Sequence, residues 1–254
     1  MDIRAIYASL ALTALMACGG GGGGSSPAPA PQPSAGITEG AWSGSIHSTA
    51  TGQTMSAAAM VIASGETRYV ASNGVQAVGT INATGTSFTG SGSMYGPTGF
   101  VFPGGSNTAA LTLSGTGTSG ASMSGSYSGG GDTGTFTFTY AAGAQYTSAI
   151  VMANMAGSYG SVATSSGYST TGRLTNSGAI SGSDAYGSFT GTLTAVDPAK
   201  NAFRVNVTYT LNGGATYTYS GLAFFDLSVS PVQLNIQTTG TAGQFAAVFA
   251  RTGP

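Results

Sequence analysis

The sequence predicts an all-β protein made of antiparallel up-and-down β-barrels, and two eight-stranded meander barrels in tandem are the arrangement it favours. Apolar residues recur at every second position, and almost nothing repeats at helical spacing. Short stretches of Gly, Asn, Asp and Pro separate these segments, so neighbouring segments are expected to pair as hairpins. Hydrophobic residues make up 41% of the 254-residue chain and charged residues only 5%. That composition is sufficient for one or two β domains with real cores.

The clearest predicted strand covers residues 135–140. Phe136, Phe138 and Tyr140 point one way and the threonines between them point the other, as a half-buried strand requires. The same alternation recurs in residues 111–113, 203–211, 232–237 and 245–249. Turns are expected at residues 72–74, 129–134, 197–198, 212–214 and 239–240. About fourteen to sixteen strands follow from this spacing.

The chain divides into two similar halves, residues 37–150 and 151–254. The segment Ser87–Ser91 resembles Ser188–Thr192, which favours an internal duplication, although a chance match in a Ser/Thr/Gly-rich chain stays open. Residues 152–156 are the expected boundary, after which residues 157–160 repeat the pattern that residues 40–43 begin. Closing each half on itself would remove its exposed strand edges. Glycines within strands fit the bends and the narrow interior of a small barrel.

The first residues form a processed segment rather than a folded one. An apolar run from Ala5 to Ala14, too short to cross a membrane, precedes Leu15-Met16-Ala17-Cys18. This resembles the lipobox of bacterial lipoproteins, which implies that residues 1–17 are a signal peptide and that Cys18 carries lipid, palmitate included. Gly19 after the cysteine implies sorting to the outer membrane. The alternative is that Cys18 is an ordinary apolar residue of a cleaved secretory signal.

Residues 18–36 are expected to be a tether, with six consecutive glycines followed by an Ala-Pro alternation. The body then shows a second resemblance, carried by residues 90–97 and by the closing residues 243–251. Both are similar to motifs in the Gly-rich β-barrel domains of surface lipoproteins such as transferrin-binding protein B and factor H binding protein. Met94 stands where that family has an aromatic residue. The resemblance implies a lipid-anchored barrel that functions by binding.

Composition argues against several other classes of partner. Six basic and seven acidic residues are scattered without a run of either sign, so the clustered cations that bind nucleic acid are missing from the sequence. A single cysteine excludes an internal disulfide, and one histidine excludes a site with two imidazole ligands. We expect no cofactor and no metal. The expected partners are the membrane, through Cys18, and an unknown protein or small molecule.

The sequence offers only weak candidates for catalysis, so we expect no enzyme. His47 is the sole histidine, and a surface or turn position is the simpler interpretation. Asp132-Thr133-Gly134 matches the aspartic-protease triplet, but no second copy supplies the paired carboxylate, and a hairpin turn is the simpler interpretation. Glycine triplets at 115–120 and 129–134 match the dinucleotide pattern only as strings, because strands rather than helices are expected after them. No Gly-x-Ser-x-Gly occurs.

Tyrosines are the remaining functional candidates, since their rings and hydroxyls suit binding surfaces; these are Tyr69, Tyr95, Tyr127, Tyr146, Tyr217 and Tyr219. Packing in the core or at a barrel rim is the alternative for each of them.

The leading hypothesis is a non-enzymatic outer-membrane lipoprotein that serves as a binding or surface-interaction module. A structural or envelope-assembly lipoprotein without a small-molecule ligand is the alternative. A hydrolase and a transmembrane barrel are less favoured, the latter because the expected outward faces carry Ser and Thr. Whether the body faces the periplasm or the medium stays open.

Overall fold

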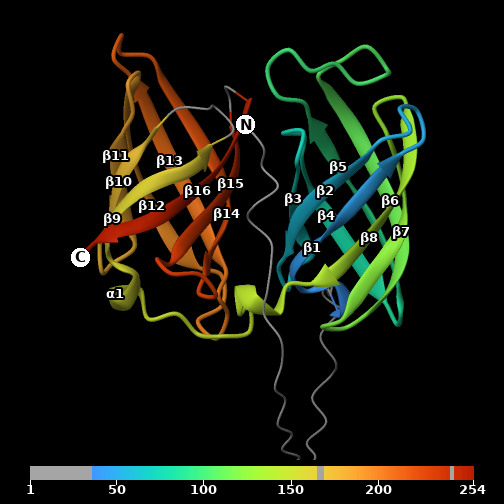
Figure 1. Ribbon diagram of the computed structural model, residues 1–254, viewed down its shortest axis with the longest axis horizontal. Helices are drawn as coiled ribbons and strands as arrows, with labels where there is room; N and C mark the ends of the chain where they lie inside the picture. The colour runs from blue at the N-terminus through green and yellow to red at the C-terminus, as the bar shows by residue number, and fades with distance from the viewer. Residues whose placement is uncertain (1–35, 165–168, 241–242) are drawn as a thin grey trace, which may run out of the picture.

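The computed structural model describes residues 36–164, 169–240 and 243–254, except for the side chains of residues 163 and 164. These residues form two closed antiparallel barrels of eight strands each, which stand side by side (Figure 1). Every strand pairs with its neighbours in sequence, and the first strand of each barrel pairs with the last. The predicted all-β fold of tandem meander barrels is therefore confirmed. Cys18, the lipobox and most of the predicted tether lie outside the described residues.

The first barrel contains β1 to β8, preceded by the short 3₁₀ turn η2 (Gly36–Thr38). Its strands are β1 (Gly40–Ser48), β2 (Thr54–Val61), β3 (Glu66–Ala71), β4 (Gln76–Thr84), β5 (Ser87–Tyr95), β6 (Thr108–Thr118), β7 (Ser122–Gly129) and β8 (Asp132–Tyr140). A linker with the 3₁₀ turn η3 (Ala142–Ala144) and the single helical turn α1 (Met152–Met155) leads to the second barrel.

The second barrel contains β9 to β16. Its strands are β9 (Gly157–Thr164), β10 (Thr171–Leu174), β11 (Ala179–Ser183), β12 (Gly187–Ala195), β13 (Phe203–Leu211), β14 (Thr216–Asp226), β15 (Gln233–Gly240) and β16 (Gly243–Gly253). The predicted strand at 203–211 matches β13 residue for residue. The predicted turn at residues 239–240 instead forms the last two residues of β15, because the alternation continues to the end of that strand.

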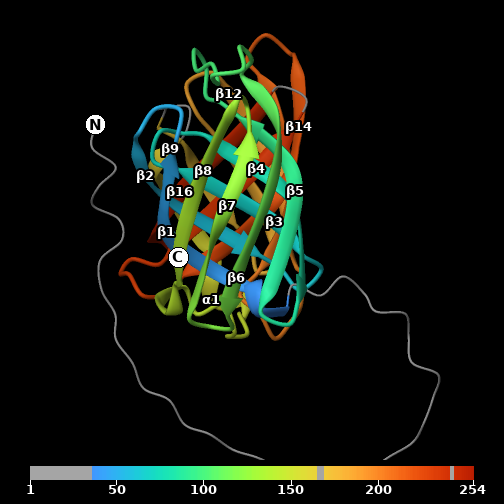
Figure 2. The ribbon, with the colours of Figure 1, turned by 90° about the vertical axis from the view of Figure 1, so that its right-hand side faces the viewer.

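The two faces of the strands differ sharply in polarity. Phe136 and Phe138 of β8 are buried inside the first barrel, whereas Thr135, Thr137 and Thr139 of the same strand are exposed. The outward positions of β7 are all serine, and they pair across the sheet with the outward threonines of β8. Apolar residues thus fill the interior and hydroxyls face outward, which is the reverse of a barrel whose outside contacts lipid. Figure 2 shows β6, β7 and β8 on the side of the first barrel that faces away from the second.

Among the described residues, no helix is both long and apolar enough to cross a membrane.

Aromatic rings inside the barrels lie opposite glycines on neighbouring strands. A Cβ added to Gly125 would lie 2.8 Å from Cζ of Phe136, its cross-strand partner. The same arrangement recurs at the pairs Phe88 and Gly115, Tyr127 and Gly134, Phe189 and Gly182, and Tyr219 and Gly240. The glycines therefore make room for rings that would otherwise overfill a small barrel.

Each barrel is closed at the end where the chain enters it. In the first barrel Trp42 is 1% exposed, and its Nε1 donates a hydrogen bond to the carbonyl of Thr38, 2.8 Å away and four residues earlier. In the second barrel Tyr159 donates from its hydroxyl to the carbonyl of Met155, also four residues earlier. A short helical turn therefore plugs the entry end of both barrels.

This correspondence supports an internal duplication. Gly40 and Gly157, which begin β1 and β9, adopt φ angles of 144° and 146°. Gly65 and Gly178 occupy matching turns before the third strand of each barrel, and their carbonyls accept hydrogen bonds from Ile81 and Leu193 in the fourth strands. The sequence match of Ser87–Ser91 with Ser188–Thr192 does not follow this order, because it aligns a fifth strand with a fourth.

An apolar cluster joins the two barrels. Met60 and Ile62 of the first barrel pack with Leu222 and Ala202 of the second, and Tyr146 of the linker completes the cluster. Around it, Arg204 donates to Glu66 across the junction at 2.7 Å, and Arg68 donates to Thr239 at 2.9 Å. The barrels are therefore fixed relative to each other by buried contacts as well as by the chain.

Candidate ligand cavity in the second barrel

The interiors of the two barrels are filled to different extents. The first barrel has a cavity of about 170 Å³ and the second has one of about 540 Å³, whose lining reaches the end away from the chain entry. The larger volume lies within the range of small-molecule sites, roughly 300–1,000 Å³. Its inner part is lined by apolar side chains, including Leu174, Ile180, Val207, Leu234 and Ile236. The second-barrel cavity is therefore the candidate functional site.

The loop between β5 and β6 explains why the first barrel is fuller. Phe100 and Phe102 in this loop pack edge to face, with ring centroids 5.0 Å apart, and Phe102 is buried in the core of the first barrel. The amide of Gly104 donates to the carbonyl of Gly130, which holds the loop over the mouth. In the second barrel the corresponding connection, between β13 and β14, is a short turn without an inserted ring.

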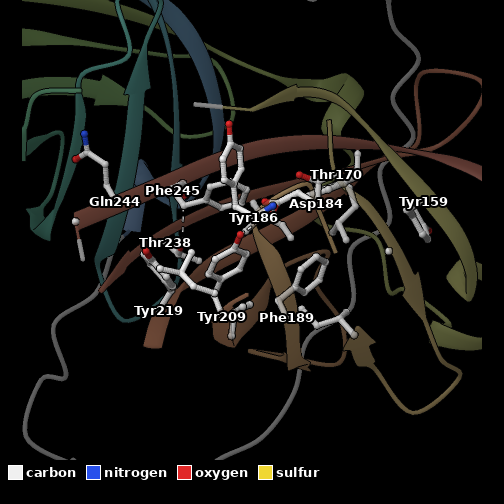
Figure 3. A pocket seen from close by; sticks show the side chains of 18 of the residues that line it. Tyr159, Thr170, Asp184, Tyr186, Phe189, Tyr209, Tyr219, Thr238, Gln244 and Phe245 are labelled. Atoms are coloured by element: carbon white, nitrogen blue, oxygen red, sulfur yellow. Dashed lines mark hydrogen bonds between the residues drawn. The ribbon is translucent and has the colours of Figure 1, made fainter. Parts of the chain in front are cut away.

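The same loop also forms part of the second cavity. Its ends, at residues 95–98 and 107–108, line the mouth of the second barrel. Gln244 of β16 reaches across to them, and its Nε2 donates to the carbonyl of Tyr95 at 3.2 Å. Figure 3 shows Gln244 on the side of the first barrel, apart from the rings of Tyr209 and Phe189. The mouth is thus a composite of both barrels.

A tyrosine and a carboxylate form the polar centre of this mouth. The hydroxyl of Tyr209 on β13 donates to Oδ1 of Asp184 at 2.7 Å (Figure 3). The same oxygen accepts from the backbone amides of Tyr186 and Gly187, at 2.8 and 3.0 Å. This turn between β11 and β12 therefore fixes the carboxylate beside the Tyr209 ring. Tyr186 itself is 49% exposed at the rim.

Burial affects the acidity of the tyrosines in the cavity. Burial raises the pKa of Tyr209 well above its usual range, and the hydrogen bond to Asp184 adds to the effect. The pKa of Tyr219 is also raised, first by burial and then by the charge of Tyr217. These phenols therefore stay protonated at neutral pH and serve as hydrogen-bond donors rather than as nucleophiles.

A second tyrosine–carboxylate pair stands at the same end of the first barrel. Tyr127 donates to Oδ2 of Asp132 at 2.7 Å, while the amide of Ala50 donates to Oδ1 at 2.9 Å. Burial opposes ionisation of Asp132, but hydrogen bonds from Ser48, Tyr127 and backbone amides outweigh it and lower its pKa. Both oxygens are thus held by the protein itself, and this pair ties two hairpins together.

The structure places both weak catalytic candidates in structural roles. His47 is exposed near the end of β1, and its Nδ1 lies 3.2 Å from the hydroxyl of Thr54. Asp132 opens β8 directly after the Gly130–Gly131 turn, as the hairpin interpretation predicts. Among the hydrogen bonds of the described residues, none joins His47 to Asp132.

Five of the six candidate tyrosines lie in three places. Tyr95 and Tyr219 line the second-barrel cavity, Tyr69 and Tyr127 line the smaller cavity, and Tyr146 is buried at the junction of the barrels. Tyr217 is half-buried on β14.

Sequence reasoning missed Asp184, Tyr186, Phe189 and Phe245 as site residues, and it placed Tyr209 only in a predicted buried face. The available clue is the turn Asp184-Ala185-Tyr186-Gly187. An aspartate in a turn commonly accepts a hydrogen bond from the backbone two residues later, and here that residue is aromatic and lies next to a strand.

Across the described ranges, no three His, Cys, Asp or Glu side chains gather closely enough to hold a metal ion. In comparisons with known proteins, no family model matches the chain, and no curated protein matches it either.

Proposed function

We propose that this chain is a lipid-anchored outer-membrane lipoprotein whose two-barrel body is a non-enzymatic binding module. The second-barrel cavity is its ligand site. The observation that carries the proposal is the contrast in volume between the two interiors, about 170 Å³ in the first barrel and about 540 Å³ in the second. A barrel of eight strands can hold one small ligand, and an apolar lining with a few fixed polar groups is typical of such sites.

The anchor is proposed from the resemblance of residues 15–18 to a lipobox. Cys18→Ser should abolish incorporation of labelled palmitate and release the protein from the membrane fraction. The wild-type protein should carry the label and sediment with outer membranes. Labelling that survives the substitution, or a soluble wild-type protein, would refute the proposed anchor. Either result would leave the proposal of a ligand cavity unaffected.

A substitution that fills the cavity with a larger side chain tests whether the cavity binds a ligand. Val207→Phe adds a ring to the inner wall of the cavity, while Val101→Phe adds the same ring at an exposed loop position as the matched control. We expect saturable binding of the neutral fluorescent probe 1-aminoanthracene to the wild type and the control, and much weaker binding to Val207→Phe. Circular dichroism would verify that all three proteins are folded.

Native mass spectrometry of the protein purified from membranes supplies a second measurement. A small molecule that is retained by the wild type and lost from Val207→Phe supports the proposal. An empty wild-type protein that also ignores the probe would favour the alternative, a structural or envelope-assembly lipoprotein without a small-molecule ligand.

A further inference from the structure

The second-barrel cavity has an unbalanced charge at its mouth. Among the described residues that line it, Asp184 is the only acidic one. Arg173 is the only basic one, but it lies on the outward face of β10, next to the inward and buried Leu174. Within the described ranges, the ion pairs join Arg68, Lys200 and Arg204 to Glu66 and Glu39, and none involves Asp184.

Among the described residues, only one of the two carboxylate oxygens of Asp184 accepts hydrogen bonds. Tyr209 and two backbone amides all donate to Oδ1, and Oδ2 has no hydrogen-bond partner among the described residues. The first barrel provides the contrast, because Asp132 there uses both oxygens. The Tyr127–Asp132 pair therefore has partners for both carboxylate oxygens, whereas the Tyr209–Asp184 pair leaves Oδ2 as an acceptor at the mouth of the cavity.

Aromatic side chains line the same cavity as this acceptor. Tyr186, Phe189, Tyr209 and Tyr219 line the cavity together with Asp184, and Figure 3 shows Tyr186, Phe189 and Tyr209 near the carboxylate. The faces of aromatic rings attract cations, most strongly where water is partly excluded. An anionic ligand would meet the opposite situation, a negative charge without an inward basic side chain to offset it.

We propose that the second-barrel cavity selects organic cations, with the apolar part of the ligand inside the barrel and its ammonium group beside Oδ2 of Asp184. This inference rests on the proposed function, because it assigns a ligand class to the same cavity.

Three probes with the same eight-carbon chain test the selection: octyltrimethylammonium, 1-octanol and octyl sulfate, each titrated by calorimetry below its micellar concentration. The wild type should bind the ammonium at least about tenfold more tightly than the alcohol, and the sulfate most weakly. Asp184→Asn keeps the Oδ1 acceptor for Tyr209 and the two amides but removes the charge. It should lose the preference for the ammonium while it retains the affinity for the alcohol.

Asp132→Asn is the matched control, since it makes the same change in the first barrel, and it should keep the preference. If Asp184→Asn proves unstable, raising the salt concentration on the wild type should weaken binding of the ammonium and leave that of the alcohol unchanged. Equal binding of ammonium and alcohol, or a preference that survives Asp184→Asn, would overturn the charge selection and leave the cavity function intact. Binding of none of the three probes would overturn the selection, while the probe and mass-spectrometry measurements above decide the cavity separately.

Discussion

At the scale of single residues, the pairs of aromatic side chain and glycine set the size of each interior. Gly125 shows how little room is left, because an added Cβ would lie 2.0 Å from the carbonyl of Ser114 and 2.8 Å from the ring of Phe136. Gly213 stands in the turn between β13 and β14, where an added Cβ meets nothing within 4 Å. Glycine is therefore required by packing at one position and replaceable at the other.

Gly125→Ala should lower the free energy of unfolding by about 1–3 kcal/mol, the usual cost of overfilling a packed interior. Gly213→Ala should change it by less than about 0.5 kcal/mol, as expected of an exposed site. Urea unfolding followed by circular dichroism gives both values. Equal effects of the two substitutions would contradict the packing role of Gly125.

The lowered pKa of Asp132 predicts that the protein loses stability in acid. Its folded-state pKa lies below the ordinary value, so the ionised form stabilises the fold. That contribution is fully present above the unfolded-state pKa, near 3.8, and is lost as the pH falls through the lower folded-state value. Melting temperatures of the wild type should therefore decline between about pH 5 and pH 2, and those of Asp132→Asn should decline less. Parallel curves would show that the charge of Asp132 does not contribute.

At the scale of elements, the loop between β5 and β6 has two roles. It closes the first barrel with Phe100 and Phe102, and its ends line the mouth of the second. A loop that fills one interior and borders another can explain why two barrels of the same topology differ in cavity volume.

Phe102→Ala should open the first barrel. Removal of this buried ring should cost about 3–5 kcal/mol of stability, or less where the loop collapses onto the gap. The enlarged apolar cavity should then bind benzene, which NMR titration of the side chains near Phe88 would detect. If benzene affects only the second barrel, Phe102 does not act as a lid.

Much of this architecture was predictable from sequence at the level of elements. Residues 203–211 show why, since their strict alternation fixes both the strand and its buried face. The cavity was less predictable, because it depends on the course of the β5–β6 loop and on contacts between barrels such as Gln244 with Tyr95. Local patterns do not encode such long-range contacts. The pairing of Tyr209 with Asp184, which lie in different strands and turns, was hidden for the same reason.

At the scale of the whole molecule, Asn201 holds the linker against the second barrel. Its side chain is fully buried, donates to the carbonyls of Ala144 and Phe225, and accepts from the amide of Phe225 at 2.9 Å. Its backbone amide donates to the carbonyl of Tyr146 at 2.8 Å. This one side chain therefore satisfies three buried backbone groups and adds to the apolar cluster that joins the barrels.

Asn201→Ala should lower the free energy of unfolding by roughly 2–4 kcal/mol, because buried backbone groups lose their partners. Asn82→Ala, an exposed position on β4, is the matched control and should have little effect. Differential scanning calorimetry measures both, and it also shows whether the wild-type barrels unfold in one transition. A neutral Asn201→Ala would mean that water replaces the lost contacts.

The even number of strands in each barrel determines where the ends of the chain lie relative to the mouth of the cavity. An antiparallel meander with eight strands returns the chain to the end where it began, so Gly40 and Gly253 both lie at closed ends, opposite the open mouth. An anchor attached before Gly36 would consequently join the body at the end opposite the mouth of the cavity. A carrier protein fused after Pro254, or a chip coupled there, would join the body at that same end and leave the mouth unobstructed.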